Sequence, residues 1–318
     1  MNLDLKDKKL LAEIEMNARI NLSSLGKRIG VSKQSVAYRI NKLESKKIIQ
    51  GYNALIDISK LSKTIYVIYL KLVKISSSEE KTWIENIEKH IKVLAVGKNA
   101  GNWDLTLVIG CKTNKELDEV LKELLSQKAD KIREKLITSE IGSIYFSTNL
   151  IYKSKNIKFK TSEVQEEIKI DQKDEQILFY LSKKCRVSLL ALSKKVNMSP
   201  NGVKNKIKIL EDKKIILGYK TKINYELLGY LQFRVFLHLK KFTPETFSKI
   251  STFLNSKGNV ESVSRYLGYA DIDFRCYVKG VVEVHDLISE IKDAFLQNVV
   301  EVDSTMIFGW EKMDYYPS

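Results

Sequence analysis

The sequence predicts an α+β protein with two winged helix-turn-helix domains, each followed by a ferredoxin-like βαββαβ domain. Three observations lead to this fold class: an internal repeat, a split of charge within each repeat, and a change in the spacing of apolar residues. A shift of 167 positions aligns the chain with itself, and over residues 3–52 roughly 19 of 50 positions are identical. A period this long indicates duplicated domains rather than a solenoid.

Positive charge is concentrated in the first part of each repeat. Residues 3–52 and residues 170–219 each carry 11 Lys and Arg against 5 Asp and Glu, so they hold 12 of the 15 net positive charges of the chain. The remaining parts of both repeats are nearly neutral. A basic segment of this kind attracts polyanions, and phosphate neutralisation is the usual source of affinity for nucleic acid.

The first 50 residues of each repeat have the spacing of three short helices. In copy one we expect helices over Asp7–Met16, about Ser23–Ile29 and Lys33–Ser45. Gly30 suits a left-handed cap at the end of the second helix, and Ser32 suits the N-cap of the third.

Copy two repeats this plan, with Ser199 as the cap and Pro200 at the first helical position. The helices are followed by Lys46–Asp57 and Lys213–Asn224. We expect each of these segments to form short paired strands, a wing whose Ile-Ile pair closes over the helices.

The rest of each repeat changes from helical to alternating spacing, in the order β-α-β-β-α-β. The strands and helices expected in copy one are Thr64–Lys74, Ser78–His90, Val93–Lys98, Leu105–Cys111, Lys115–Gln127 and Lys135–Phe146. Those expected in copy two are Leu231–Lys240, Pro244–Ser256, Val260–Tyr266, Asp271–Val278, Val284–Phe295 and Val299–Gly309.

These elements divide the chain into five parts. We expect winged helix-turn-helix domains over 1–57 and 170–224, ferredoxin-like effector and oligomerisation domains over 58–146 and 225–313, and a polar linker over 147–169. The two ferredoxin-like domains could pair within one chain as a pseudo-dimer or between chains as a homo-oligomer. The sequence leaves both arrangements open.

The third helix of each copy is the candidate recognition helix. Val36, Ile40 and Leu43 fall on one stripe that faces the core, which turns polar and basic side chains outward to the DNA major groove. Amide side chains suit adenine, and Arg or Lys suits guanine or phosphate. The candidate DNA-binding residues are Ser32, Lys33, Gln34, Ser35, Tyr38, Arg39, Lys42, Ser199, Asn201, Lys204, Asn205, Lys206 and Lys208.

The outward faces of the two helices differ in residue type. If both contact bases, the preferred double-stranded DNA site is a degenerate, asymmetric palindrome. A plain solvated helix face is the alternative that needs no DNA.

The N-terminal segment contains a pattern of residues with a fixed order and spacing: Leu3-Asp4, Asp7, Leu10-Leu11, Ala18-Arg19, Leu25, Ser32, Val36, Arg39-Ile40, Leu43-Glu44 and Ile48-Ile49-Gly51-Tyr52. This pattern resembles the Lrp/AsnC family of transcription regulators. The βαββαβ unit is similar to that family's effector-sensing domain. The resemblance implies winged-helix DNA binding, dimers with face-to-face sheets, and small-molecule effectors, often amino acids. The chain departs from the family pattern because two units are fused.

By the same resemblance, two Gly-x-x-Asp turns are the candidate effector loops. Their residues are Gly101, Asn102, Trp103, Asp104, Gly268, Tyr269 and Asp271. From the residues alone the glycines are turn formers, and aspartates at such turns most often bond local backbone. Because the residues between Gly and Asp differ, the two turns need not bind the same ligand.

A catalytic function has little support, and we expect no catalytic residue, no cofactor and no metal. The histidines, His90, His238 and His285, do not align across the repeat, and no hydrolase or phosphate-binding motif is present. Siroheme decarboxylases resemble this family in fold and also occur as paired units, so such an enzyme is the alternative function. A third hypothesis is an interaction module in which one winged helix contacts protein.

No apolar stretch is long enough to cross a bilayer, and the first residues lack the apolar core of a signal peptide. The cysteines Cys111, Cys185 and Cys276 are odd in number and form no CxxC pair. We therefore expect a cytoplasmic protein without a membrane partner.

Overall fold

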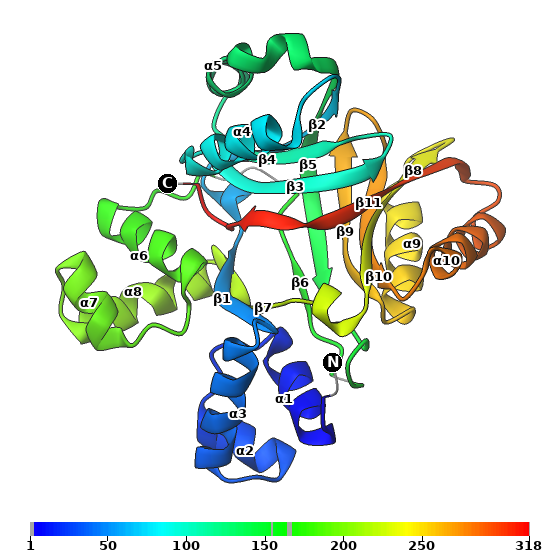
Figure 1. Ribbon diagram of the computed structural model, residues 1–318. Helices are drawn as coiled ribbons and strands as arrows, with labels where there is room; N and C mark the ends of the chain where they lie inside the picture. The colour runs from blue at the N-terminus through cyan, green and yellow to red at the C-terminus, as the bar shows by residue number, and fades with distance from the viewer. Residues whose placement is uncertain (1–2, 154, 164–166, 318) are drawn as a thin grey trace.

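The fold follows the predicted repeat, with each copy contributing the same order of elements (Figure 1). It was obtained as a computed structural model, which describes residues 3–153, 155–163 and 167–317. Copy one contains α1 (Leu5–Glu15), α2 (Leu22–Ile29), α3 (Lys33–Ser45), β1 (Ile49–Ile56), η1 (Ile58–Lys60), β2 (Thr64–Leu72), α4 (Ser77–Lys89), β3 (Val93–Gly101), β4 (Leu105–Cys111), α5 (Asn114–Leu125), η2 (Ser126–Lys131) and β5 (Ile132–Phe146).

The second half of the chain begins after the short connecting strand β6 (Lys158–Lys160). Copy two contains α6 (Gln172–Lys183), α7 (Leu189–Val196), α8 (Pro200–Asp212), β7 (Ile216–Ile223), η3 (Glu226–Leu228), β8 (Leu231–Leu239), α9 (Pro244–Ser256), β9 (Val260–Leu267), β10 (Ile272–Val278), α10 (Val281–Ala294) and β11 (Val299–Met313). The predicted elements are therefore present in both copies, with small differences at their ends.

The helix-turn-helix units begin and end where the sequence chemistry predicts. Ser32 and Ser199 cap α3 and α8, and each hydroxyl accepts the backbone N–H three residues further on. Gly30 ends α2 with φ of 70°, a left-handed conformation that costs glycine little. Asn197 takes the same left-handed position after α7 with φ of 49°.

The prediction of a separate wing in each copy is wrong. β1 and β7 are single strands, and they pair with each other in antiparallel register, from Ile49 opposite Ile223 to Ile56 opposite Ile216. Each segment is one uninterrupted strand without a hairpin turn, so its hydrogen-bonding edge needs a partner from elsewhere in the chain. The other copy supplies that partner, and the two helix-turn-helix units share one two-stranded ribbon between them.

Reciprocal contacts between the copies hold this ribbon to the helices. The Arg19 guanidinium lies 4.9 Å from the Tyr219 ring centroid, and Arg186 lies 5.0 Å from that of Tyr52. The backbone N–H of Ala18 donates to the Tyr219 carbonyl at 2.9 Å. The arginine and the tyrosine are identical in the two copies, and each Arg-Tyr pair joins one copy to the other.

The two ferredoxin-like domains form one closed sheet within the chain. Their strands follow the order β2-β4-β3-β11-β8-β10-β9-β5, and β5 also pairs with β2, which closes the ring. The fifteen-residue strands β5 and β11 make this possible. β5 pairs first with β2 and then with β9 of the other copy, and β11 pairs with β8 and then with β3. Of the two arrangements left open by the sequence, the structure shows the intramolecular pseudo-dimer.

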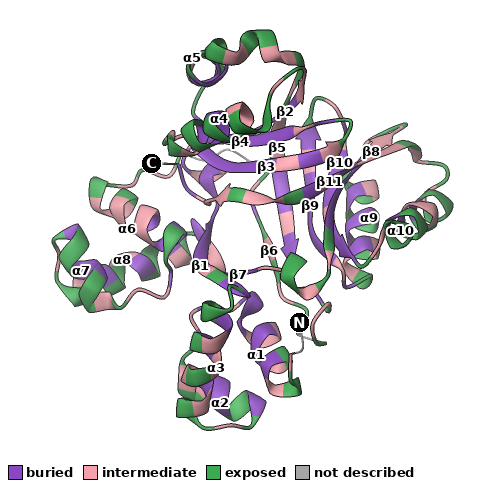
Figure 2. Cartoon of the chain, in the orientation of Figure 1, coloured by how far each residue is buried: buried purple, intermediate pink, exposed green. Residues whose placement is uncertain are grey.

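Alternating side chains build three apolar layers around this sheet. Ile68 and Leu70 of β2 face α4 and α5, and the equivalent face of β8 packs on α9 and α10. Tyr69 points to the opposite side, where it meets Phe236 from the other copy. Figure 2 shows this distribution: buried residues follow the strands and the inner faces of the helices, while the outer helix faces are exposed.

The segment 147–169 was predicted to be a linker without regular structure, and its described part is more ordered than that. β6 pairs with the end of β5, and the Phe159 ring covers Gly218 of β7. The backbone N–H of Thr148 donates to the Glu15 carboxylate. Residues 154 and 164–166 of the predicted linker, and residues 1–2 of the first predicted domain, lie outside the described residues.

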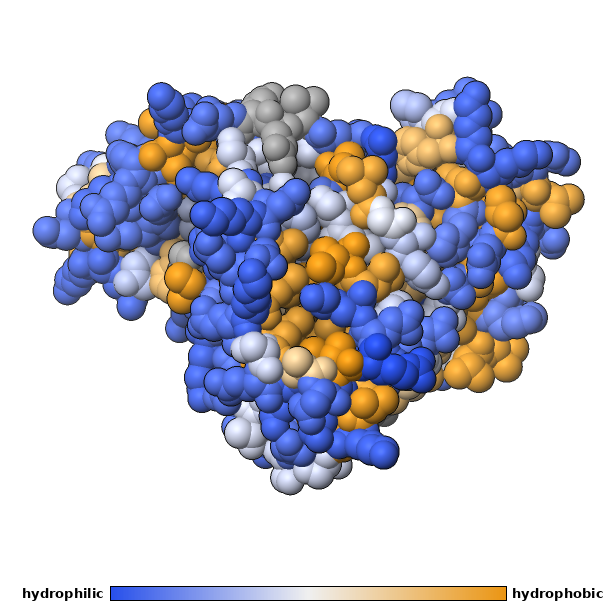
Figure 3. Space-filling model, turned by 90° about the horizontal axis from the view of Figure 1, so that it is seen from above, coloured by the Kyte–Doolittle hydropathy of each residue, from blue (hydrophilic) through white to orange (hydrophobic). Residues whose placement is uncertain are grey.

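The face seen from above is largely hydrophilic, with apolar side chains gathered near its middle (Figure 3). In the described part of the chain, no helix is both long and apolar enough to cross a membrane.

Candidate nucleic-acid interface and ligand cavity

Helix α3 presents the face that its sequence predicts. Val36, Ile40 and Leu43 are buried in the core, while Lys33 and Gln34 are exposed. Tyr38 is 69% exposed, which is unusual for a tyrosine without a partner. None of these three outward side chains (Lys33, Gln34 and Tyr38) forms a hydrogen bond or an ion pair within the described chain. They are therefore available to a partner molecule.

Arg39 faces another way than predicted, because its guanidinium is held by helix α1. Its Nη1 lies 2.7 Å from Asp4 Oδ2 and 2.5 Å from Asp7 Oδ1, and its side chain is 19% exposed. The same hydrogen bond lowers the pKa of the Asp4 carboxyl. Lys42 also approaches Asp7, at 3.4 Å. Arg39 therefore docks the recognition helix on the first helix and is poorly placed to read a base.

Copy two repeats this ion pair with a different cation. Lys206 Nζ lies 2.7 Å from Asp171 Oδ2 and 2.9 Å from Asp174 Oδ1. The outward side chains of α8 that form no hydrogen bond or ion pair within the described chain are Asn201, Lys204, Asn205 and Lys208.

Ser35 of α3 is partly exposed, and the capping serines Ser32 and Ser199 keep their hydroxyls on backbone N–H groups. A serine at such a cap lies where the free N–H groups of a helix attract phosphate. Ile209 of α8 is 51% exposed, at the position that Lys42 occupies in copy one. The two candidate interfaces thus share a scaffold and differ in the side chains they present.

The Gly-x-x-Asp turns are built alike in both copies. Gly101 and Gly268 have φ of 123° and 126°. Asp104 Oδ2 accepts the backbone N–H of Leu72, and Asp271 Oδ2 accepts that of Leu239, both at 2.7 Å. Each carboxylate therefore holds the neighbouring strand, as the structural alternative for these aspartates predicts.

The residues between Gly and Asp differ in their environment. Asn102 is exposed, whereas Trp103 is buried inside the closed sheet. The Trp103 ring centroid lies 5.8 Å from that of Tyr69 and 6.4 Å from that of Tyr269. The Tyr269 hydroxyl donates to Asp303 Oδ2 at 2.6 Å. Because these side chains are buried or already hydrogen-bonded, the turns offer few free polar groups to an effector.

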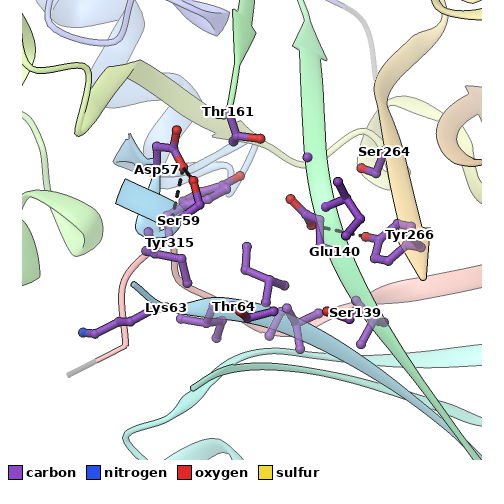
Figure 4. A pocket seen from close by; sticks show the side chains of 18 of the residues that line it. Asp57, Ser59, Lys63, Thr64, Ser139, Glu140, Thr161, Ser264, Tyr266 and Tyr315 are labelled. Atoms are coloured by element: carbon purple, nitrogen blue, oxygen red, sulfur yellow. Dashed lines mark hydrogen bonds between the residues drawn. The ribbon is translucent and has the colours of Figure 1, made fainter. Parts of the chain in front are cut away.

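A cavity of about 400 Å³ lies inside the closed sheet, beside the end of β1. One wall is apolar and includes Ile65, Val67, Leu94 and Val108. The other walls carry polar side chains, among them Glu140, Thr161, Ser264 and Tyr266, as Figure 4 shows. A space of this size and mixed lining suits a small organic molecule.

The repeat-related side of the molecule holds a smaller cavity of about 250 Å³ whose interior is occupied by a polar network. Lys220 forms an ion pair with Glu261, and Gln232 donates to Glu261 Oε2 at 3.2 Å and to the Tyr277 hydroxyl at 3.0 Å. Burial alone would raise the pKa of Glu261. The Lys220 ammonium has the opposite effect and outweighs burial, so the pKa falls from its ordinary value to about 2.

In copy one, the positions of Gln232, Glu261 and Tyr277 are held by Ile65, Leu94 and Gly110. These residues cannot form that network. The two cavities thus lie at equivalent positions of the repeat but are lined by different side chains.

The sequence alone does not predict this cavity. Glu140 lies on β5, which pairs with β2 of its own copy and then with β9 of the other copy, and its position inside the closed ring depends on that crossing. The one signal in the sequence was an acidic residue in an otherwise apolar and small-residue strand, Ser139 to Gly142. No histidine is among the described residues that line either cavity: His90 caps α4, His238 is on β8 and His285 is on α10.

The capped recognition helices and the shared ribbon define a protein with two helix-turn-helix domains. A family model of the AsnC-type helix-turn-helix domain matches residues 3–44, and a winged helix-turn-helix DNA-binding model matches residues 170–216. HTH-type transcriptional regulators of Pyrococcus furiosus and Pyrococcus abyssi are both 31% identical, over 126 and 133 residues. The matches cover 39% and 42% of this chain and 84% of each relative. The chain belongs to the Lrp/AsnC family of transcription regulators.

The duplicated arrangement also has a structural counterpart. The crystal structure of the siroheme decarboxylase NirDL matches 98% of this chain and 94% of its own chain with a TM-score of 0.62 and 11% sequence identity. At this identity the likeness concerns the fold alone.

Proposed function

We propose that this protein is a sequence-specific regulator that places both recognition helices in the major groove of one double-stranded DNA site. The observation that carries this proposal is the pair of capped helices α3 and α8, with unpartnered amide and basic side chains, joined through one ribbon. Because the ribbon fixes one unit against the other, the spacing of two half-sites would be set by the protein.

The proposed contacts divide into three groups. Gln34, Tyr38, Asn201 and Asn205 face outward and are the candidates for base edges. The candidates for phosphate contacts are Ser32, Lys33, Ser35, Lys42, Ser199, Lys204 and Lys208. Arg39 and Lys206 act through their ion pairs with the first helix of each unit, as positioning residues.

We further propose that a small molecule bound in the ferredoxin-like part modulates DNA binding. The 400 Å³ cavity supports this, because Asp57 and Ser59 in its wall directly follow β1 of the shared ribbon. A ligand that favours one position of this junction would shift the relative orientation of the recognition helices. The family resemblance implies that the effector is an amino acid. Assembly of several copies of this chain into an oligomer stays a prediction as well.

Genomic footprinting of the bound protein tests the proposal, with Gln34→Ala and Asn205→Ala as variants. Each variant should lose about 1–3 kcal/mol at one base position while keeping its fold. Lys249→Ala, an exposed lysine on α9 far along the chain from the helix-turn-helix units, is the matched control and should bind as the wild type does. Absence of any enriched DNA would end the proposal.

The siroheme decarboxylase alternative rests on the shared fold of the whole chain. It predicts that added siroheme changes its absorbance spectrum on binding. The carboxylate-rich tetrapyrrole would have to fit a cavity whose described lining includes Glu140 and Glu163 and no histidine. That chemistry argues against it.

A further inference from the structure

Glu140 differs from the other carboxylates that line the 400 Å³ cavity, because its partners in the described chain are two hydroxyl groups and include no cation and no backbone N–H. Ser143 Oγ donates to its Oε1 at 2.7 Å, and the Tyr266 hydroxyl donates to its Oε2 at 3.3 Å. No Lys, Arg or His of the described chain forms an ion pair with it. A carboxylate can accept about four hydrogen bonds, and the described residues supply two of them to Glu140.

The cationic side chains around the cavity are already engaged. Arg234 forms a buried ion pair with Asp273. Arg275 Nε donates to Ser262 at 2.9 Å and lies 3.9 Å from Glu261. The Lys63 ammonium sits 4.5 Å from the centroid of the Tyr316 ring.

The remaining carboxylates of the cavity wall are engaged as well. Glu163 pairs with Lys160 and Arg265. Asp57 accepts hydrogen bonds from Ser162 N–H at 2.6 Å and from the Ser59 hydroxyl at 2.6 Å. Asp314 lies 3.8–3.9 Å from two lysines. Glu140 is therefore the carboxylate of the cavity that receives no ion pair and no backbone hydrogen bond from the described chain.

The surroundings of Glu140 are those of a binding site rather than of a solvated surface. Figure 4 shows Glu140 reaching from β5 into the space that Asp57, Ser59 and Tyr315 border on the far side. The opposite wall is apolar, with Ile65, Val67 and Val108. In copy two the position of Glu140 is held by Ile307, which is buried, so the acidic group occurs on one side only.

We infer that this cavity binds a small organic cation, with its ammonium group on the Glu140 carboxylate and its apolar body against Ile65, Val67 and Val108. A carboxylate that is partly withdrawn from water is stabilised when a cation supplies charge and hydrogen bonds, and a bound ammonium does both. The inference rests on the proposed function for its regulatory meaning, and it names the ligand class of that function.

Calorimetric titration of the full-length protein with matched probes tests the inference. The amines are 2-phenylethylamine and tryptamine, their neutral counterparts are 2-phenylethanol and tryptophol, and the anions are 3-phenylpropionate and indole-3-propionate. At least one amine should bind, and its alcohol and acid should bind at least tenfold more weakly. Binding of no amine, or equal or tighter binding of an acid, would overturn the inference.

Two variants test the role of the carboxylate itself. Glu140→Gln keeps the size of the side chain and should weaken amine binding at least tenfold. Glu245→Gln removes an exposed carboxylate that is paired with Lys249 on α9, outside the cavity, and it should bind amines as the wild type does. Unchanged amine binding by Glu140→Gln would contradict the inference.

DNA binding is measured on the same samples, so the two proposals fail separately. Loss of amine binding with DNA binding intact rejects only the ligand class. Amine binding without DNA binding rejects only the regulator.

Discussion

At the scale of single residues, the recognition helices show which predictions a sequence supports. The buried stripe of Val36, Ile40 and Leu43 followed from helical spacing, since a period of 3.6 residues decides which side chains face the core. The ion pair of Arg39 did not follow, because its acidic partners lie on another helix, 32 and 35 residues away. Only the docking of α1 against α3 brings these charges together.

We predict that Arg39 and Asp7 are energetically coupled. Asp7 is almost fully buried, so either single change, Arg39→Ala or Asp7→Asn, removes a charge-assisted hydrogen bond from a sheltered site. A double-mutant cycle by urea unfolding should give a coupling free energy of about 1–2 kcal/mol. Lys33→Ala, on the free face of α3, should change stability by less than about 0.5 kcal/mol. Additive effects of the two changes would show that Arg39 is not a positioning residue.

At the scale of elements, helix and strand positions were predictable, and strand partners were not. The helix Lys33–Ser45 and the strand Leu105–Cys111 have the predicted limits. The segments of β1 and β7 were recognised as strands, yet alternation looks the same whether a strand pairs with its neighbour or with a distant copy. The reciprocal Arg19-Tyr219 and Arg186-Tyr52 contacts join one copy to the other.

The ribbon offers a matched pair of glycines for a test. A Cβ at Gly218 would overlap the Phe159 ring of the connecting segment, whereas a Cβ at the repeat-equivalent Gly51 would meet only Asn53 Oδ1, at 3.9 Å. We predict that Gly218→Ala lowers the free energy of unfolding by about 1–3 kcal/mol, because the ring must move. Gly51→Ala should stay within about 1 kcal/mol of the wild type. Equal effects in urea unfolding would mean that the segment does not pack on the ribbon.

At the scale of the whole molecule, the closed sheet and the ribbon make one unit of two repeats. The duplication was visible in the sequence, but the closure was not, since it depends on β5 and β11 crossing between the copies. The cavity beside Glu140 exists only because of that closure. The sequence indicates instead the turns at Asp104 and Asp271, whose carboxylates accept backbone N–H groups.

Glu15 connects three parts of the molecule and makes its stability depend on pH. Its carboxylate accepts hydrogen bonds from Thr148 and from the Tyr225 hydroxyl of copy two. Burial raises the pKa of Glu15 from its ordinary 4.5 to about 7. The folded state therefore keeps the Glu15 proton up to a higher pH than the unfolded state does. As a result, the free energy of unfolding should fall by up to about 3 kcal/mol as the pH rises from about 4.5 to 7.

Comparison with Glu15→Gln isolates this contribution, because the other titrating groups are common to both proteins. The amide side chain does not titrate, so the free energy of unfolding of the variant should decline less between pH 4.5 and 7 than that of the wild type. The same decline in both proteins would assign the pH dependence to other groups.

The central claim is that two fixed recognition helices with different faces read one DNA site. Selection from a random pool of double-stranded DNA tests it most directly. The account predicts an enriched site with two unlike half-sites at one fixed spacing, and Gln34→Ala and Asn205→Ala should each relax a different half. A perfectly symmetric site, or no enrichment at all, would contradict it.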